Sequence, residues 1–276
     1  MGKLTIGIYF ATKYDRMNKF FNYIIIFTVA SILNPLIRLI FLSLKELGIS
    51  TANITLLSLI TSWLLLLTFG QLLIILNESK PIEYVETSTD EVPSLDWGVL
   101  NQYTYDIESL GFHKLIDYKP SNLSRSGLAR LFSHPKYHCF IEVYQISGLP
   151  TTCVVKSLFI NEWSLANVNR QFRGLLGGLM YMRRLNRSLC IAQPGVSPSE
   201  LLDNHLARRT KMMRDLEIDI STDISIDAYF NYERSQAKKR LQIIKSKWIA
   251  ILLIEAIVYA LHPKSEWMGE YNCLSS

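Results

Sequence analysis

The stretch "SGLARLFSHPKYHCFIEVYQISGLPTTCVVKSLFI", residues 126–160, decides the fold. It contains three short runs rich in β-branched, aromatic and aliphatic residues, "SGLARLFS", "CFIEVYQI" and "TCVVKSLFI". Between them lie "HPKYH" and "SGLPT", whose Pro, Gly and Ser residues are typical of turns. The stretch therefore predicts successive antiparallel hairpins. Just downstream, "WSLANVNR" is a candidate fourth strand.

Helices are predicted on both sides of these strands. "DWGVLNQYTYDIESLGF", residues 96–112, carries apolar residues at helical spacing and ends with a Gly suited to a left-handed cap. "SPSELLDNHLARRTKMMRDLEI", residues 197–218, starts with Ser197 as the N-cap, Pro198 at the first helical position and Glu200 completing a capping box. Residues 96–225 therefore predict an α+β domain with an antiparallel sheet and flanking helices.

The second helix carries two polar residues on its apolar side, His205 and Arg209. A buried guanidinium stays charged and needs an acceptor, ideally a carboxylate. In the simplest register Arg130 and Glu142 lie opposite each other, and Lys156 joins the same row. We predict that Glu142 meets Arg209 and His205 beneath the second helix, while the first helix covers the opposite, apolar face. The alternative is a solvated ladder of cross-strand charges.

These residues define a candidate polar centre with a ligand-binding or a structural role. Its members are Arg130, Glu142, His205 and Arg209.

The N-terminal part predicts a membrane segment, in keeping with a composition that is 49% hydrophobic. Residues 53–76, "NITLLSLITSWLLLLTFGQLLIIL", carry no charge and, as a helix, are long enough to span a hydrocarbon core of roughly 30 Å. Residues 20–44 are also long enough, provided that the helix kinks at Pro35 and Arg38 snorkels. We predict a transmembrane helical hairpin over residues 20–76. A secretory signal peptide fits less well, because the apolar run is too long and no A-x-A-like site follows it.

Charge patterning predicts the orientation of that hairpin. The arm of residues 1–19 holds Lys3, Lys13, Arg16 and Lys19, whereas Lys45 is the single basic residue of the loop. The positive-inside rule then places the arm, and with it the domain, in the cytoplasm. "NESKPIEYVETSTDEVPSLD" has six acids and one lysine, so we interpret residues 77–95 as an acidic linker. Four cysteines without a C-x-x-C pair favour a reduced compartment, and we expect a bacterial-type inner membrane.

Residues 226–262 predict one long helix that is first basic and then apolar. The candidate lipid-headgroup contacts are Lys238, Lys239, Arg240, Lys245 and Lys247. Residues 248–261 are apolar apart from Glu255, and as a helix they are too short for an ordinary span. A short third span, an interfacial or re-entrant helix, and a core helix of the domain all stay open. Residues 263–276 form a tail.

Motifs that would identify an enzyme are missing from the sequence. It has no Walker A loop, no G-x-G-x-x-G after a strand, no G-x-S-x-G and no Cys/His group with zinc-ligand spacing, so we expect no cofactor or metal. His138 and Cys139 are adjacent, but neighbouring strand residues point to opposite faces. We expect a non-enzymatic cytoplasmic module that binds a protein, a lipid or a small ligand. The rival is a membrane-bound enzyme that uses a polar site around Glu142, His205 and Arg209.

Nucleic-acid binding is the third and least favoured class. A basic region interspersed with aromatic residues supports it: Arg170, Phe172, Arg173, Tyr181, Arg183, Arg184 and Arg187. The same arginines suit lipid phosphates equally well. The net charge of +5 adds little to this class, because the N-terminal arm already supplies a surplus of three.

Overall fold

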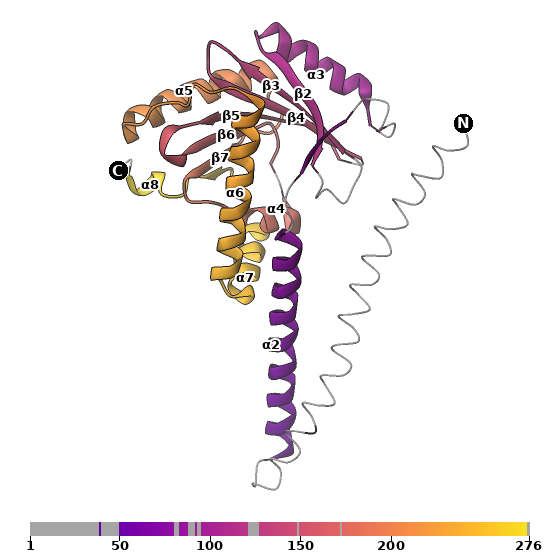
Figure 1. Cartoon of the computed structure of the whole chain (residues 1–276). Helices are drawn as coiled ribbons and strands as arrows, with labels where there is room; N and C mark the ends of the chain where they lie inside the picture. Colours follow the sequence, from indigo (N-terminus) through magenta and orange to yellow (C-terminus); the bar gives the residue numbers. More distant parts are fainter. Residues whose placement is uncertain are drawn as a thin grey trace, which may run out of the picture. The chain divides into compact units, whose positions relative to one another are not determined.

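The computed structural model describes Leu39 and residues 50–79, 83–87, 92, 95–120, 127–147, 149–171 and 173–274. The chain divides into two compact units, residues 1–76 and 77–276. Figure 1 labels most of the helices and strands.

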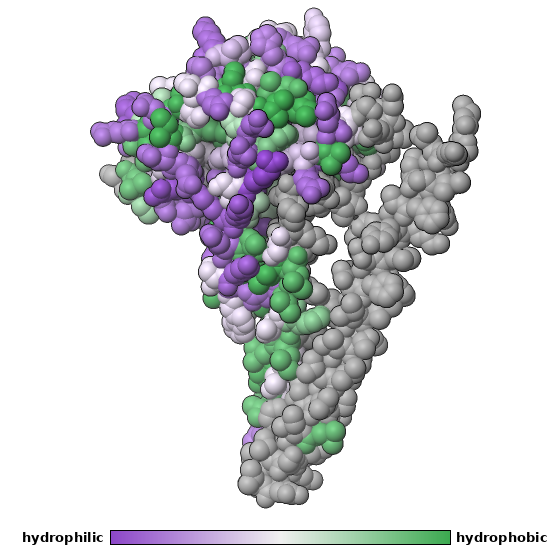
Figure 2. Space-filling model, viewed as in Figure 1, coloured by the Kyte–Doolittle hydropathy of each residue, from purple (hydrophilic) through white to green (hydrophobic). Residues whose placement is uncertain are grey.

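Helix α2 (Thr51–Glu78) makes up nearly all of the described part of the first unit. It is the one helix among the described residues that is long and apolar enough to cross a membrane. Figure 2 shows hydrophobic side chains along it. Its hydroxyls donate to carbonyl oxygens three or four residues earlier, as Thr55, Thr61 and Thr68 do, so they need no water. Apart from Leu39, residues 20–44, the predicted first arm of the hairpin, lie outside the described residues.

An eight-stranded sheet organises the second unit, and its spatial order follows the chain from β1 to β8. The strands are β1 (Tyr84–Glu86), β2 (His113–Pro120), β3 (Gly127–His134), β4 (Cys139–Ile146), β5 (Thr152–Leu158), β6 (Ser164–Val168), β7 (Ser188–Ala192) and β8 (Glu266–Trp267). All neighbours pair antiparallel except β6 and β7, which are parallel. The connection between those two contains helix α4 (Gly174–Tyr181), the kind of crossover that parallel strands need. The α+β fold is thus confirmed, but the sheet is mixed and not purely antiparallel.

The predicted strands correspond to β3, β4, β5 and β6. The sequence analysis missed β2, β7 and β8. It also missed β1, which lies inside the segment interpreted as an acidic linker and pairs with β2.

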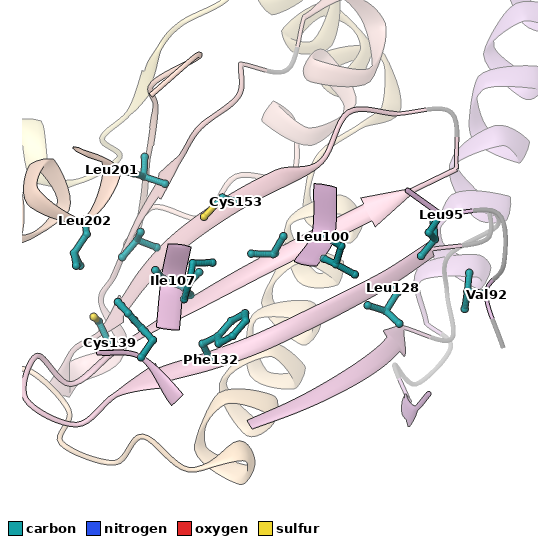
Figure 3. Packing of buried hydrophobic residues seen from close by; sticks show 14 residues of the cluster. Val92, Leu95, Leu100, Ile107, Leu128, Phe132, Cys139, Cys153, Leu201 and Leu202 are labelled. Carbon is teal, nitrogen blue, oxygen red and sulfur yellow. The ribbon is translucent and has the colours of Figure 1, made fainter. Parts of the chain in front are cut away.

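One face of the sheet is covered by α3 (Trp97–Ser109) and α5 (Pro198–Leu216), the two predicted helices (Figure 1). Asp96 and Ser197 cap them by accepting from the backbone N–H groups of Val99 and Glu200. Figure 3 shows how Leu100 and Ile107 of α3 and Leu201 of α5 lie over the strands. Their burial supplies much of the hydrophobic stabilisation of this layer.

Helix α6 (Ile226–Ser246) covers the other face. Its Tyr229 and Phe230 pack on side chains from β2, β3 and β4, including Leu131 and Phe140. The prediction that one helix covers each face is therefore wrong for α5, since it shares its face with α3.

The register of β3 and β4 differs by one residue from the simplest register. Arg130 pairs with Val143, and Glu142 pairs with Leu131. The cause is a four-residue turn, residues 135–138, in which His138 has a φ of 47°. The ring of His134 accepts from two backbone N–H groups of this turn. Because a shift of one residue reverses the faces, Arg130 and Glu142 lie on opposite sides of the sheet.

The predicted C-terminal helix is two helices. The backbone is extended at Lys247, where α6 ends, and α7 (Ile249–Leu261) starts after Trp248. Helix α7 packs against α4. The chain then forms β8 and α8 (Tyr271–Leu274).

Candidate functional site

A chain of hydrogen bonds runs beneath α5. The Nη1 atom of Arg209 lies 3.4 Å from Ser157 Oγ, which lies 2.7 Å from His205 Nε2. His205 Nδ1 lies 2.9 Å from Asn167 Oδ1, and the Asn167 amide donates to Gln193 over 3.0 Å. Since a guanidinium only donates, the hydroxyl of Ser157 is left to donate to Nε2, and His205 carries its hydrogen on Nδ1. Each group in this series of hydrogen bonds then donates to the next one, from Arg209 toward Gln193.

His205 is held neutral in this chain. Burial, helped by the positive charge of Arg209, lowers the pKa of His205 to about 3. Arg209 also donates to the carbonyl oxygen of Tyr137 over 2.5 Å. The partners of these two residues are therefore a hydroxyl, an amide and a carbonyl, not a carboxylate. Among the described residues, the buried Nε atom of Arg209 has no hydrogen-bond partner.

The order Ser157, His205, Asn167 has the form of a nucleophile, a base and an orienting group. However, Ser157 and His205 are 0% exposed and Asn167 is 1% exposed. Cys139, the thiol near Arg209, is also buried, and burial raises its pKa to about 12. These groups are closed to solvent in this structure, and their hydrogen bonds join α5 to β5 and β6.

Glu142 lies on the opposite face, under α6. It accepts hydrogen bonds from the hydroxyls of Tyr118 and Tyr229, the second over 2.8 Å. Burial and then the charge of Glu142 raise the pKa values of both tyrosines well above the ordinary value, so both stay protonated donors. The predicted contact of Glu142 with Arg209 and His205 is therefore wrong, because the sheet separates them.

A buried ion pair lies next to Glu142. Lys156 Nζ is 2.5 Å from Glu233 Oε1, and Arg240 approaches the same carboxylate at 3.6 Å. Burial alone would lower the pKa of Lys156, but Glu233 and Glu142 raise it above its usual value. Burial raises the pKa of Glu233, but Lys156 and Arg240 outweigh it and leave that pKa below the usual value. Lys156 lies on the face of Glu142 but pairs with Phe140, so the predicted row through Arg130, Glu142 and Lys156 is not formed. The cluster fastens α6 to the sheet.

Arg130 lies on the α3 and α5 face, with Asp117 of β2 as its partner. Two bonds of 2.7 and 2.9 Å join the guanidinium to the carboxylate, and Thr104 of α3 accepts a third. Burial raises the pKa of Asp117, but Arg130 and Lys114 outweigh it and lower that pKa below the usual value. The sequence analysis missed Asp117. Alternation along "HKLIDYKP" was the signal that would have placed it opposite Arg130.

Three of the five predicted headgroup cations make ion pairs inside the second unit. Lys239 contacts Glu162, Arg240 contacts Glu233, and Lys247 contacts Glu255. Lys238 and Lys245 are exposed.

A cavity of about 400 Å³ lies beside β8. Its walls include the charged side chains of Arg184, Lys264, Glu266 and Glu270. Three of these make ion pairs: Arg184 with Glu255, Glu266 with Arg208, and Glu270 with Arg187. Within the described part of the chain, no three His, Cys, Asp or Glu side chains are grouped to hold a metal ion.

No family model, curated protein or solved structure matches this chain.

Proposed function

We propose that this protein is an integral membrane protein whose second unit is a cytoplasmic interaction module. The observation that carries the proposal is α2, a continuous apolar helix with exposed large side chains such as Leu56 and Trp63. Its hydroxyls bond within the helix, which suits a hydrocarbon environment.

The orientation rests on the sequence. The basic arm of residues 1–19 favours a cytoplasmic N-terminus, and a hairpin over residues 20–76 returns the chain to the same side. A bacterial-type inner membrane is the setting that we propose.

Interaction is favoured over catalysis because the buried polar side chains on both faces of the sheet find partners within the protein. His205 and Arg209 are bound by Ser157 and Asn167, and Glu142 by two tyrosines on the other face. These groups fix the helices on the sheet and present no reactive atom to a substrate. The partner is a protein or a small ligand in addition to the bilayer, and the cavity beside β8 is the candidate ligand position. Nucleic acid is not favoured.

Membrane integration is tested by alkaline carbonate extraction of membranes that contain the full chain. We expect the protein to stay in the pellet, and a Leu65→Arg, Leu67→Arg variant to be extracted, because an arginine in the centre of a span disfavours insertion by about 2.5–3.5 kcal/mol. The control variant Tyr105→Arg, at an exposed position on α3, should stay in the pellet. Release of the unchanged protein into the supernatant would contradict the proposal.

A further inference from the structure

Helices α4 and α7 form a pair that belongs to none of the three hydrophobic clusters of the second unit. A Cβ atom added at Gly178 of α4 would lie 2.2 Å from the carbonyl oxygen of Ala256 of α7, so the two backbones touch where the helices cross. On α7 the buried side chains are Ile249, Leu252, Ala256 and Tyr259. One side of α7 is thus packed.

The other side of α7 is apolar and open. Six large side chains on it or at its start are 49 to 69% exposed: Trp248, Ile251, Ile254, Ile257, Val258 and Leu261. Such a continuous apolar surface on a folded domain marks a site of interaction. No described residue buries it.

The exposed charged residues that adjoin this surface in the chain are mostly basic. Glu255, the single acid of α7, contacts Arg184 at 2.9 Å and Lys247 at 2.7 Å, so its charge is neutralised. Exposed cations lie in the chain next to the ends of the two helices: Arg173 before α4, Lys245 before α7 and Lys264 after it. An apolar centre with a basic rim complements an anionic lipid surface.

We propose that α7 lies in the plane of an anionic bilayer surface, with its open side among the acyl chains and α4 behind it. As a helix its 13 residues extend only about 20 Å, too short to cross a hydrocarbon core of about 30 Å. Trp248 at its start suits the interfacial region, where tryptophan is enriched. The inference rests on the proposed function, because α2 would hold the second unit at the bilayer through the short connection between Glu78 and Tyr84.

Lipid is a better occupant of this surface than a second copy of the chain. In a twofold dimer the basic rims of two α7 surfaces would face each other and repel, whereas lipid phosphates would neutralise them.

The test uses the full chain reconstituted into vesicles of phosphatidylcholine and phosphatidylglycerol. Nitroxide labels are attached to single introduced cysteines in a Cys190→Ser, Cys273→Ser background, in which Cys139 and Cys153 are buried. The positions are Ile254 on α7, Leu59 on α2 and, as the aqueous control, Tyr105 on α3, which is 72% exposed. All three side chains are exposed, so the substitutions should leave the fold intact. Collisions with oxygen, which enters the lipid phase, are compared with collisions with a water-soluble nickel chelate.

We expect the oxygen-to-nickel ratio at Ile254 to exceed that at Tyr105 about tenfold, and Lys245→Gln with Lys264→Gln to reduce it. If the oxygen-to-nickel ratio is high at Leu59 but as low at Ile254 as at Tyr105, α7 does not contact lipid; the inference then fails and the proposed function stands. If the ratio at Leu59 is also as low as at Tyr105, α2 is not in the membrane and the proposed function fails. If Ile254 is shielded from both reagents and labels on two chains show dipolar broadening, a second copy covers the surface and the lipid assignment is overturned.

Discussion

Arg130 and Arg209 enter the same face of the sheet, yet their charges are stabilised differently. Arg130 binds a carboxylate in a bidentate manner, whereas Arg209 binds a carbonyl and a hydroxyl. Burial lowers the pKa of Arg209, which has no acid as a partner in its hydrogen bonds. Removal of the Arg130 side chain therefore leaves a buried carboxylate without its partner, whereas removal of the Arg209 side chain leaves only neutral acceptors.

A double-mutant cycle tests the pairing of Arg130 with Asp117. Arg130→Met or Asp117→Asn alone should destabilise the protein by about 3–5 kcal/mol, because each leaves a buried group unpaired, and the double variant should lose much less than the sum. The more exposed pair Arg187 and Glu270 serves as the control, with an effect of about 0–1 kcal/mol. The free energy of unfolding is measured on the full chain in detergent, with pulse proteolysis reporting the folded fraction at each urea concentration. Additive effects at Arg130 and Asp117 would contradict the pairing.

His205 makes stability depend on pH. In the unfolded chain its pKa is near 6.5, whereas in the folded protein it is about 3, so the unfolded state gains the proton first as the pH falls. The stabilisation is complete above pH 6.5 and is lost progressively between pH 6.5 and 3. From pH 7 to 5 this loss amounts to about 2 kcal/mol.

The matched variants are His205→Gln and His113→Gln, the second at an exposed position. His205→Gln should be less stable at pH 7 but should lose about 2 kcal/mol less than the wild type between pH 7 and 5. His113→Gln should keep the wild-type loss. Equal losses in all three proteins would show that His205 titrates normally in the folded state.

At the scale of elements, the local sequence predicted which helices and strands exist better than it predicted how the strands pair. The alternation in "CFIEVYQI" identified β4, and Ser197 and Pro198 identified the start of α5. The register of β4 depended on the turn before it, which His138 closes with a positive φ and which no Gly or Asn announced. One residue of register decided whether Glu142 or Val143 faced α5, so the polar centre was predicted with the wrong partners.

The break between α6 and α7 was hidden for a similar reason. "RLQIIKSKWIAILL" contains no Gly or Pro, and its helical pattern continues through Lys247. The break places α7 against α4, where Lys247 and Arg184 share Glu255. These contacts are long-range and leave no local signal. For β2, Lys114 and Asp117 among apolar residues made the strand hard to recognise, although Asp117 binds both Lys114 and Arg130.

The crossing of α4 and α7 predicts contrasting effects for two helical glycines. Gly178→Ala should cost about 1–3 kcal/mol, because the added methyl meets the backbone of Ala256, which cannot move cheaply. Gly98→Ala in α3 should be neutral or stabilising by up to about 1 kcal/mol, since its Cβ would make only an ordinary contact, 3.4 Å, with Asp96 Oδ1. Hydrogen exchange should show faster exchange of α7 amides in Gly178→Ala alone. Unchanged protection of α7 would argue against the close crossing.

At the scale of the whole molecule, a large sheet with internally satisfied polar clusters follows an apolar helix in the chain. Polar contacts of Arg130, Lys156 and His205 join α3, α6 and α5, respectively, to the sheet, while α7 keeps an open apolar surface. A domain that rigidifies its interior and leaves one helix exposed is suited to presenting surfaces to partners. This organisation is the basis of the proposal that the second unit is an interaction module.

The side of the membrane on which the second unit lies is tested through Cys273. Among the cysteines of the described residues, Cys273 is exposed, whereas Cys139 and Cys153 are buried. A membrane-impermeant maleimide should therefore leave the protein unlabelled in intact cells and label it after permeabilisation, because the basic arm favours a cytoplasmic domain. Cys273→Ser should abolish most of that signal, and adding Tyr105→Cys on α3 should restore it with the same dependence on permeabilisation. Labelling of Cys273 in intact cells would place the second unit outside and would reverse the orientation inferred from the arm.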